Sequence, residues 1–88
     1  MKIETEINQV ILSDWMVHEL NLKDSELLVF AVIDNATFYA QGYNQSIKKM
    51  TKLIGYSPSH IYKTIRRLKD RNLITKIGKT YYSKIRTK

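Results

Sequence analysis

The basic side chains between residues 58 and 71 have the clearest chemical potential in this sequence. Ile61, Ile65 and Leu68 recur there at intervals of four and three residues, which predicts a helix with one narrow apolar seam. The side chains opposite and beside that seam belong to Ser59, His60, Tyr62, Lys63, Arg66, Arg67 and Asp70. Hydroxyl, ammonium and guanidinium groups on an outward helix face are donors for phosphate oxygens and for base edges in the major groove of DNA. We therefore expect this segment to bind a polyanion.

The residues at the ends of this segment predict its limits. Ser57 is a preferred N-cap and Pro58 is pre-organised for the first helical position, so the helix is expected from Pro58 to about Arg71. Asn72 tolerates a positive φ and suits the stop. Within the helix, Asp70 can reach Arg66 or Arg67 across one turn, which would occupy one of these two cations.

A β-hairpin is predicted over residues 73–85. LITKI and TYYSKI flank Gly78-Lys79, and a Gly followed by another residue favours a type II′ turn. Loops of two, three and four residues all fit, so the register stays open, and a slip of one residue exchanges the two faces. Tyr81 and Tyr82 alternate, so one of them is expected to pack inward while the other is free to bind a phosphate.

A shorter helix is expected before the helix that begins at Pro58, over residues 46–54. Its inner face is formed by Ile47, Met50, Leu53 and Ile54, and Lys48, Lys49 and Lys52 lie on its other side. Gly55 is expected to end this helix, because the residue that follows a helix often has a positive φ and is usually glycine. The lysines are consistent with phosphate contact and equally with an ordinary solvated helix face. Residues 46–72 thus read as helix, Gly-containing turn and helix.

The first half of the chain is predicted to contain a strand, a short helix and a central helix. Residues 7–12 are short and β-branched enough for a strand, and Ser13 can cap a helix over residues 14–20 that stops at Asn21. Residues 23–40 hold the central helix, whose LLVFAVI stretch is apolar on nearly every side. One short chain is not expected to cover it fully. It is therefore a core helix, or part of its surface and the N-terminal segment form a dimer interface.

Length, charge and composition bound the function. The 88 residues allow one domain, mainly α with a small β-hairpin wing, divided into residues 1–22, 23–40, 46–72 and 73–85. The net charge of +7 is unevenly placed, with −5 over residues 1–44 and +12 over residues 45–88. We expect the basic half to meet a polyanion and the acidic half to face away from it. The chain begins without a signal-peptide pattern and has no long apolar run, which favours a cytoplasmic protein.

The sequence offers little for catalysis or for a cofactor. It has no Cys, no glycine-rich nucleotide-binding motif, no His-Glu-x-x-His and no Ser/His/Asp set. Two isolated His residues make a metal site improbable, and His18 is expected to be structural. We therefore predict no catalytic residue, no metal, no cofactor and no small-molecule ligand.

The quoted segments also resemble a known family. SIKKMTKLIGYSPSHIYKTIRRLKDRNLI looks like the helix-turn-helix of winged-helix DNA-binding proteins, closing with Leu68, Leu73 and Ile74. VILSDWMVHELNLKDSELLVFAVI is similar to the lead-in of replication-initiator domains encoded by phages and plasmids. The resemblance covers residues 7–85. It implies a winged helix-turn-helix that binds specific sites in double-stranded DNA for replication, conjugative transfer or transcription control of a mobile element. From the apolar central helix and the N-terminal segment we further expect a homodimer.

What the resemblance implies for individual residues follows from the family's docking geometry. The start and outer face of the second helix would contact DNA through Ser57, Ser59, His60, Tyr62, Lys63, Arg66 and Arg67, and the wing through Lys76, Lys79, Thr80 and Lys84. Cations are about equally dense in the two elements, so docking led by the wing is an alternative. Two further alternatives are a protein–protein adaptor and a module that binds single strands or RNA by stacking on Tyr62, Tyr81 and Tyr82.

Overall fold

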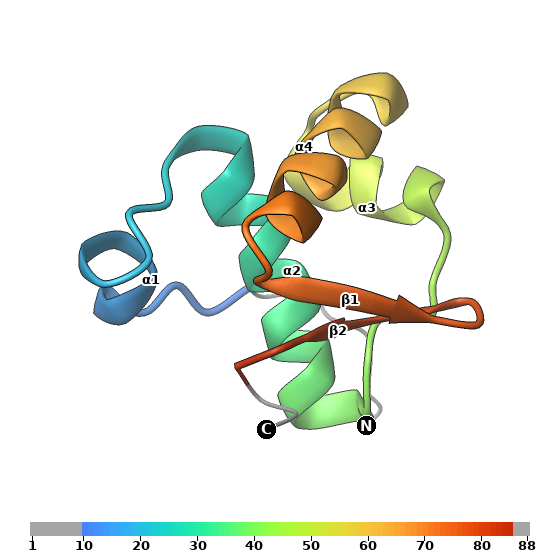
Figure 1. Ribbon diagram of the computed structural model, residues 1–88. Coiled ribbons are helices and arrows are strands. Elements are labelled where there is room, and N and C mark those ends of the chain that lie inside the picture. The colour runs from blue at the N-terminus through green and yellow to red at the C-terminus, as the bar shows by residue number, and fades with distance from the viewer. Residues whose placement is uncertain (1–9, 86–88) are drawn as a thin grey trace.

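A central helix organises the fold, which the computed structural model describes for residues 10–85. The elements in chain order are α1 (Asp14–His18), α2 (Asp24–Ala40), α3 (Ile47–Ile54), α4 (Pro58–Asp70), β1 (Ile74–Ile77) and β2 (Thr80–Ser83). The described chain is thus mainly helical with one small antiparallel hairpin, as predicted (Figure 1). None of the described helices is long and apolar enough to cross a membrane.

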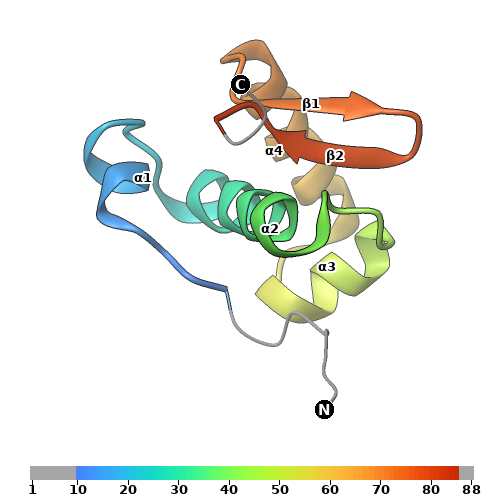
Figure 2. The same ribbon diagram turned by 90° about the horizontal axis from the view of Figure 1, so that it is seen from below.

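The apolar stretch of α2 forms the core. The five side chains from Val29 to Ile33 are 0% exposed, and burial continues to Ala36. Seen along its axis, α2 is surrounded by α1, α3, α4 and the hairpin (Figure 2). The core-helix prediction is therefore confirmed. The expectation that one chain could not cover this stretch is wrong, because α1, α3, α4 and β2 together cover it.

The strand expected over residues 7–12 is not found in its described part. Residues 7–9 lie outside the described residues, and residues 10–12 form no strand. Instead, the Asn35 amide of α2 accepts a hydrogen bond from the Ile11 N–H and donates one to the Ile11 carbonyl, both at 3.0 Å. A side-chain amide offers the same donor and acceptor pair as a neighbouring strand, so the backbone of Ile11 is satisfied without a sheet.

Helix α1 is shorter than predicted. It ends at His18 rather than at Leu20, and Ser13 precedes it in an extended conformation without a side-chain cap bond. Asn21 is left-handed as expected, with φ 56°, and Asp24 also has positive φ, at 54°. These two residues with positive φ lie on either side of Leu22 and direct its side chain into the core, where it is 1% exposed.

The caps of α3 and α4 follow the sequence signals. Ser46 accepts a hydrogen bond from the Lys49 N–H at 3.0 Å, and Ser57 accepts one from the His60 N–H at 3.3 Å. Gly55 closes α3 with φ 85°, and Asn72 follows α4 with φ 64°. Each cap satisfies a backbone group that the helix end leaves open. The helix–turn–helix pattern over residues 46–72 is therefore formed.

The hairpin has the two-residue loop Gly78-Lys79, with Ile77 paired to Thr80 and Ile74 paired to Ser83. Gly78 has a positive φ of 62°, whereas the φ of Lys79 is negative. A positive φ followed by a negative one is typical of a type II′ turn. This register buries Tyr81, at 8% exposure, as one of the two alternating tyrosines was expected to be. On its other edge, β2 pairs with Tyr43 through two hydrogen bonds between Tyr43 and Tyr81 of 2.8 and 2.9 Å.

Gly42 allows the chain to leave α2 and pass close to β2. Its φ is 116°, and an added Cβ would lie 2.5 Å from Thr80 Cγ2 and 2.7 Å from Tyr82 Cε1. Gly55 and Gly78 also have positive φ but have open space around them. Backbone conformation constrains all three positions, whereas packing constrains Gly42 alone.

Replacing Gly42 with alanine should therefore destabilise the protein more than the same change at Gly55. We expect Gly42→Ala to lower the free energy of unfolding by about 3 kcal/mol, because strain and overlap add, and Gly55→Ala by about 1 kcal/mol from strain alone. Urea denaturation followed by circular dichroism measures both. Equal losses in the two variants would show that the contact with β2 is not tight.

Candidate nucleic-acid interface

The outer face of α4 brings together three predicted contact residues. Ser59, Lys63 and Arg66 are spaced by four and three residues and are exposed. They lie opposite the buried line of Ile61 and Ile65, which holds the helix against α2. Because the buried seam is narrow, most of the circumference of α4 remains in solvent.

The exposed cations of α4 have no internal partners. Among residues 10–85, the ion pair that the structure contains joins Arg71 to Glu26 at 3.3 Å, and Arg71 also donates to the Leu20 carbonyl. The predicted contact of Asp70 with Arg66 or Arg67 does not form in this part of the chain. Lys63, Arg66 and Arg67 therefore keep their charge available for a ligand, while Arg71 is used to fasten α4 to α2.

The four predicted wing residues occupy different environments. Lys79 is exposed in the turn, and the Lys76 ammonium lies 5.2 Å from the centre of the Tyr81 ring. Lys84 donates to Asn72 Oδ1 at 2.7 Å, which ties the end of the hairpin to the end of α4. Thr80 is half-buried and faces Gly42. The structure thus leaves Lys76 and Lys79 accessible and gives Lys84 and Thr80 structural contacts.

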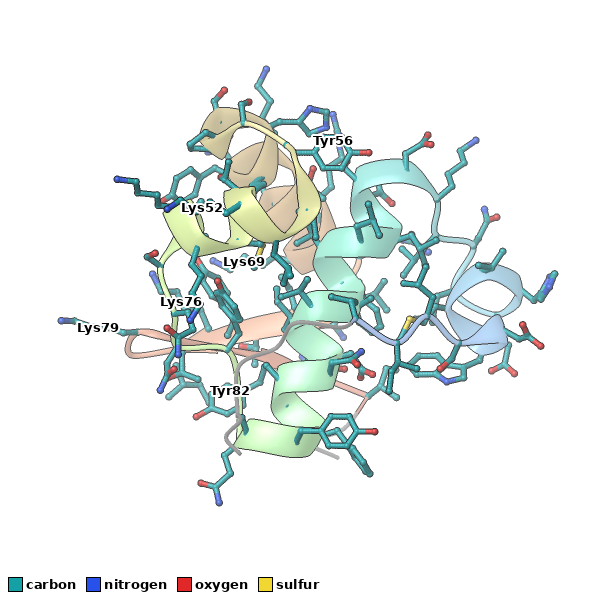
Figure 3. The ribbon with its side chains drawn as sticks, turned by 180° about the vertical axis from the view of Figure 1, so that it is seen from behind. Lys52, Tyr56, Lys69, Lys76, Lys79 and Tyr82 are labelled. Carbon is teal, nitrogen blue, oxygen red and sulfur yellow. The ribbon has the colours of Figure 1, made fainter. Side chains whose placement is uncertain are left out.

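Two further lysines lie on the same side of the molecule as the hairpin lysines. Figure 3 shows Lys52 of α3 and Lys69 of α4 on the side of α2 that carries Lys76 and Lys79, and α1 on the other side. Lys48 and Lys49 of α3 are exposed as well. Lys69 was missed as a site residue because its helical position lies beside the seam rather than opposite it, and sequence periodicity does not show which neighbour lies there.

Apart from Asp34, which is buried in α2, the described acids lie on other elements than these lysines, with one exception. Asp14 and Glu19 belong to α1 or its end, and Asp24 and Glu26 to the first turn of α2. In Figure 1, α1 and the tip of the hairpin lie on opposite sides of α2. Asp70 is the exception, since it lies on α4 among the cations. The uneven charge along the sequence thus becomes an uneven charge across the molecule.

His60 is held by α2 rather than extended freely from α4. Its Nε2 lies 3.1 Å from Ser25 Oγ, Ser25 Oγ lies 3.0 Å from Thr64 Oγ1, and Thr64 donates to the His60 carbonyl at 2.9 Å. The imidazole also packs on the Tyr56 ring, with ring centres 4.7 Å apart. Sequence periodicity placed His60 and Thr64 on α4 but gave no signal for Ser25, which is 35 residues away from His60.

The three tyrosines predicted to stack on single-stranded bases offer little surface for this contact. Tyr62 is 53% exposed, whereas Tyr81 is buried and Tyr82 is half-buried against Gly42. Stacking on single strands needs several exposed ring faces. The described surface therefore provides one of the three rings on which single-strand binding would depend.

Comparison with protein-family models, with curated proteins and with solved structures finds no match to this chain. Within residues 10–85, no three His, Cys, Asp or Glu side chains lie together in a group that could hold a metal ion.

Tyr43 connects the start of α3 to the hairpin, and its hydroxyl is titratable. The side chain is 3% exposed and donates to the Ser46 carbonyl at 2.7 Å. Burial raises the pKa of Tyr43 from 10.0 to about 12, although a backbone hydrogen bond at Met50 opposes the change. The folded protein therefore keeps this proton to a higher pH than the unfolded chain does.

The stability that Tyr43 contributes should be complete below pH 10.0 and disappear as the pH rises toward 12. We expect the free energy of unfolding to fall over this range by about 2 kcal/mol more in the wild type than in Tyr43→Phe. At neutral pH the variant should be less stable by about 1 kcal/mol because it lacks the bond to Ser46. Urea titrations at several pH values measure both differences, and parallel pH profiles would contradict the role of Tyr43.

Proposed function

We propose that this domain is a winged helix-turn-helix that binds specific sites in double-stranded DNA. The observation that carries the proposal is the outer line of α4, where Ser59, Lys63 and Arg66 are exposed and the two cations form no ion pair with another described residue. A single helix fits the major groove only if it projects from the body, and the narrow seam of α4 allows this. The resemblance of residues 46–74 to winged-helix sequences supports the same fold.

In the proposed complex, α4 enters the major groove, α3 braces it, and the hairpin runs along the phosphates. The two-residue loop makes the wing short, so Lys76 and Lys79 are suited to phosphates rather than to deep insertion in the minor groove. Lys52 and Lys69 lie on the same side and extend this phosphate contact (Figure 3). An arginine such as Arg66 can bind guanine through two hydrogen bonds, which is the contact that sequence-specific binding would use.

The proposed biological role is that of a DNA-binding factor of a plasmid, phage or other mobile element, acting in replication, conjugative transfer or transcription control. It rests on the likeness of the residues before and within α2 to the lead-in of replication-initiator domains. The split of charge supports a DNA partner over a protein–protein adaptor, because Lys63, Arg66 and Arg67 form no ion pair within residues 10–85.

Self-association is the second part of the proposal. Large apolar side chains are exposed before α1, on α1 and at the end of α2, with exposures of 50% for Ile11, 41% for Val17, 57% for Phe38 and 66% for Tyr39. Asn35 holds Ile11 against the last turns of α2, which brings the first of these groups near the last. Exposed apolar residues on these segments favour a homodimer interface, in the region where sequence patterning predicts it.

DNA binding should depend strongly on salt and on the outer face of α4. If six to eight cations meet phosphates, the logarithm of the binding constant should fall with the logarithm of salt concentration at a slope of about −5 to −7. Lys63→Ala and Arg66→Ala should each weaken binding about tenfold, and each should reduce the slope by about one if its residue contacts a phosphate. Fluorescence anisotropy with a labelled duplex measures both. Glu19→Gln on the far side also changes the net charge by one and should leave the slope unchanged.

Variants of the two elements decide which of them leads the docking. We compare Lys63→Ala/Arg66→Ala with Lys76→Ala/Lys79→Ala on the same duplex, by affinity and by footprint. Loss in the hairpin variant alone would overturn docking led by α4, whereas similar losses mean shared docking. Preference for a single-stranded competitor would contradict groove binding. Absence of binding to any duplex at low salt would refute the DNA proposal and leave the adaptor.

The homodimer should dissociate when the exposed aromatic residues of α2 become polar. Phe38→Ser/Tyr39→Ser should sediment as a monomer at a concentration where the wild type is a dimer, because it removes the largest exposed apolar groups. Ile77→Ser is the matched control, since Ile77 is 67% exposed but lies on the hairpin, and it should stay dimeric. A monomeric wild type at high concentration would refute the dimer.

A further inference from the structure

The bonds around His60 define where its proton lies, and from them we infer a dependence of DNA binding on pH. We propose that Ser25 positions the His60 ring so that it binds a DNA phosphate as a cation, and that affinity therefore rises as the pH falls. The inference rests on the proposed DNA binding. Ser25 is the positioning residue, and His60 is the residue that meets the phosphate.

The direction of each hydrogen bond follows from counting protons. The Thr64 hydroxyl donates its one proton to the His60 carbonyl, since a carbonyl can only accept. The bond of 3.0 Å between Thr64 and Ser25 must therefore be donated by Ser25. Having given its own proton to Thr64, Ser25 accepts from His60 Nε2 across 3.1 Å. The proton of the neutral imidazole is thus fixed on Nε2.

Two consequences follow from this proton on Nε2. First, Ser25 and His60 do not form a nucleophile and base, because the histidine donates to the serine. Second, Nδ1 is the nitrogen that gains the second proton, and it makes no hydrogen bond within the described residues. Protonation therefore breaks none of the three bonds that hold the ring. The charged and neutral forms can share one geometry.

The charges that face His60 come from several elements. On α4, Lys63 and Arg67 lie one and two turns further along, and the positive end of the helix dipole is close. On α2, Asp24 and Glu26 flank Ser25, and Glu26 is paired with Arg71. The Tyr56 ring packs on the imidazole at 4.7 Å, a contact that favours a cation. No acid of the described chain lies within ion-pair distance of His60.

A DNA phosphate would supply the negative charge that this environment lacks. His60 is exposed in the first turn of α4, next to Ser59 at the start of the outer line. This is the end of a major-groove helix that comes nearest to the DNA. The negative phosphate stabilises the positive charge of the protonated ring, and the protonated ring in turn attracts the phosphate. Phosphate binding and protonation of Nδ1 therefore favour each other.

The test is the pH dependence of DNA affinity, measured with a fluorescein-labelled mixed-sequence duplex of about 20 base pairs at constant ionic strength. For the wild type, Kd should fall about fivefold to tenfold between about pH 8 and about pH 5.5. His60→Gln stays neutral, so its Kd should be the same at both pH values. Ser25→Ala should lose most of the dependence because the ring is no longer held. Circular dichroism checks that each variant is folded.

Matched controls separate positioning from general effects of substitution. His18→Gln removes the other histidine and Ser13→Ala another helix-terminal serine, both at α1, so both variants should keep the full pH dependence. Nuclear magnetic resonance provides an independent measurement, in which addition of the duplex should move the ring signals of His60 in the wild type and leave those of His18 unchanged.

The outcomes distinguish this inference from the function on which it rests. An affinity independent of pH in the wild type, with weaker binding by Lys63→Ala, overturns the role of His60 and keeps the DNA proposal. Full pH dependence in Ser25→Ala overturns the positioning role of Ser25. If the wild type binds no duplex at any pH, the proposed function itself fails.

Discussion

Burial of the apolar stretch of α2 is the constraint on which the rest of the structure depends. The apolar side chains of this stretch are removed from water on every side of the helix. The hydrophobic effect that results is the largest favourable contribution to folding. In a short chain, each remaining element must contribute part of the cover. Helix α4 contributes Ile61, Ile65 and Leu68, and the hairpin contributes Ile74 and Tyr81. Apart from Tyr62 and Ile77, which are exposed, the outer surfaces of these two elements carry mainly polar and charged side chains.

This division explains why the cations of α4 have so few internal partners. Helix α4 meets α2 through its seam alone, and the acids of the first half belong mainly to α1 and to the first turn of α2. Arg71 is close enough to reach Glu26, whereas Lys63 and Arg66 face outward. Cations left close together repel one another and reduce stability, and a bound polyanion or high salt relieves the repulsion. The arrangement favours binding over stability.

Local signals predicted those parts of the fold that depend on neighbours in sequence. Ser57, Pro58 and Asn72 marked the limits of α4 because capping is decided within one helical turn, and the sign of φ at Gly78 and Lys79 follows from turn chemistry. Contacts between distant residues were not predictable in this way. The amide of Asn35 satisfies Ile11 across 24 residues, and Ser25 meets His60 across 35. One sequence contains no periodicity that identifies such pairs, and the strand expected near Ile11 was wrong for this reason.

The contact between Tyr43 and Tyr81 changes what the hairpin exposes. On one edge β2 is bonded to β1. On the other edge, Tyr81 forms a bridge with Tyr43 and the Ser83 N–H donates to Thr37 Oγ1, so the more open edge of the hairpin belongs to β1. That edge is four residues long and carries Lys76, and both shortness and a lysine discourage another strand from pairing there. A surface rich in unpaired backbone groups would otherwise invite stacking of one copy on the next. The small sheet is thereby protected against growth into fibres.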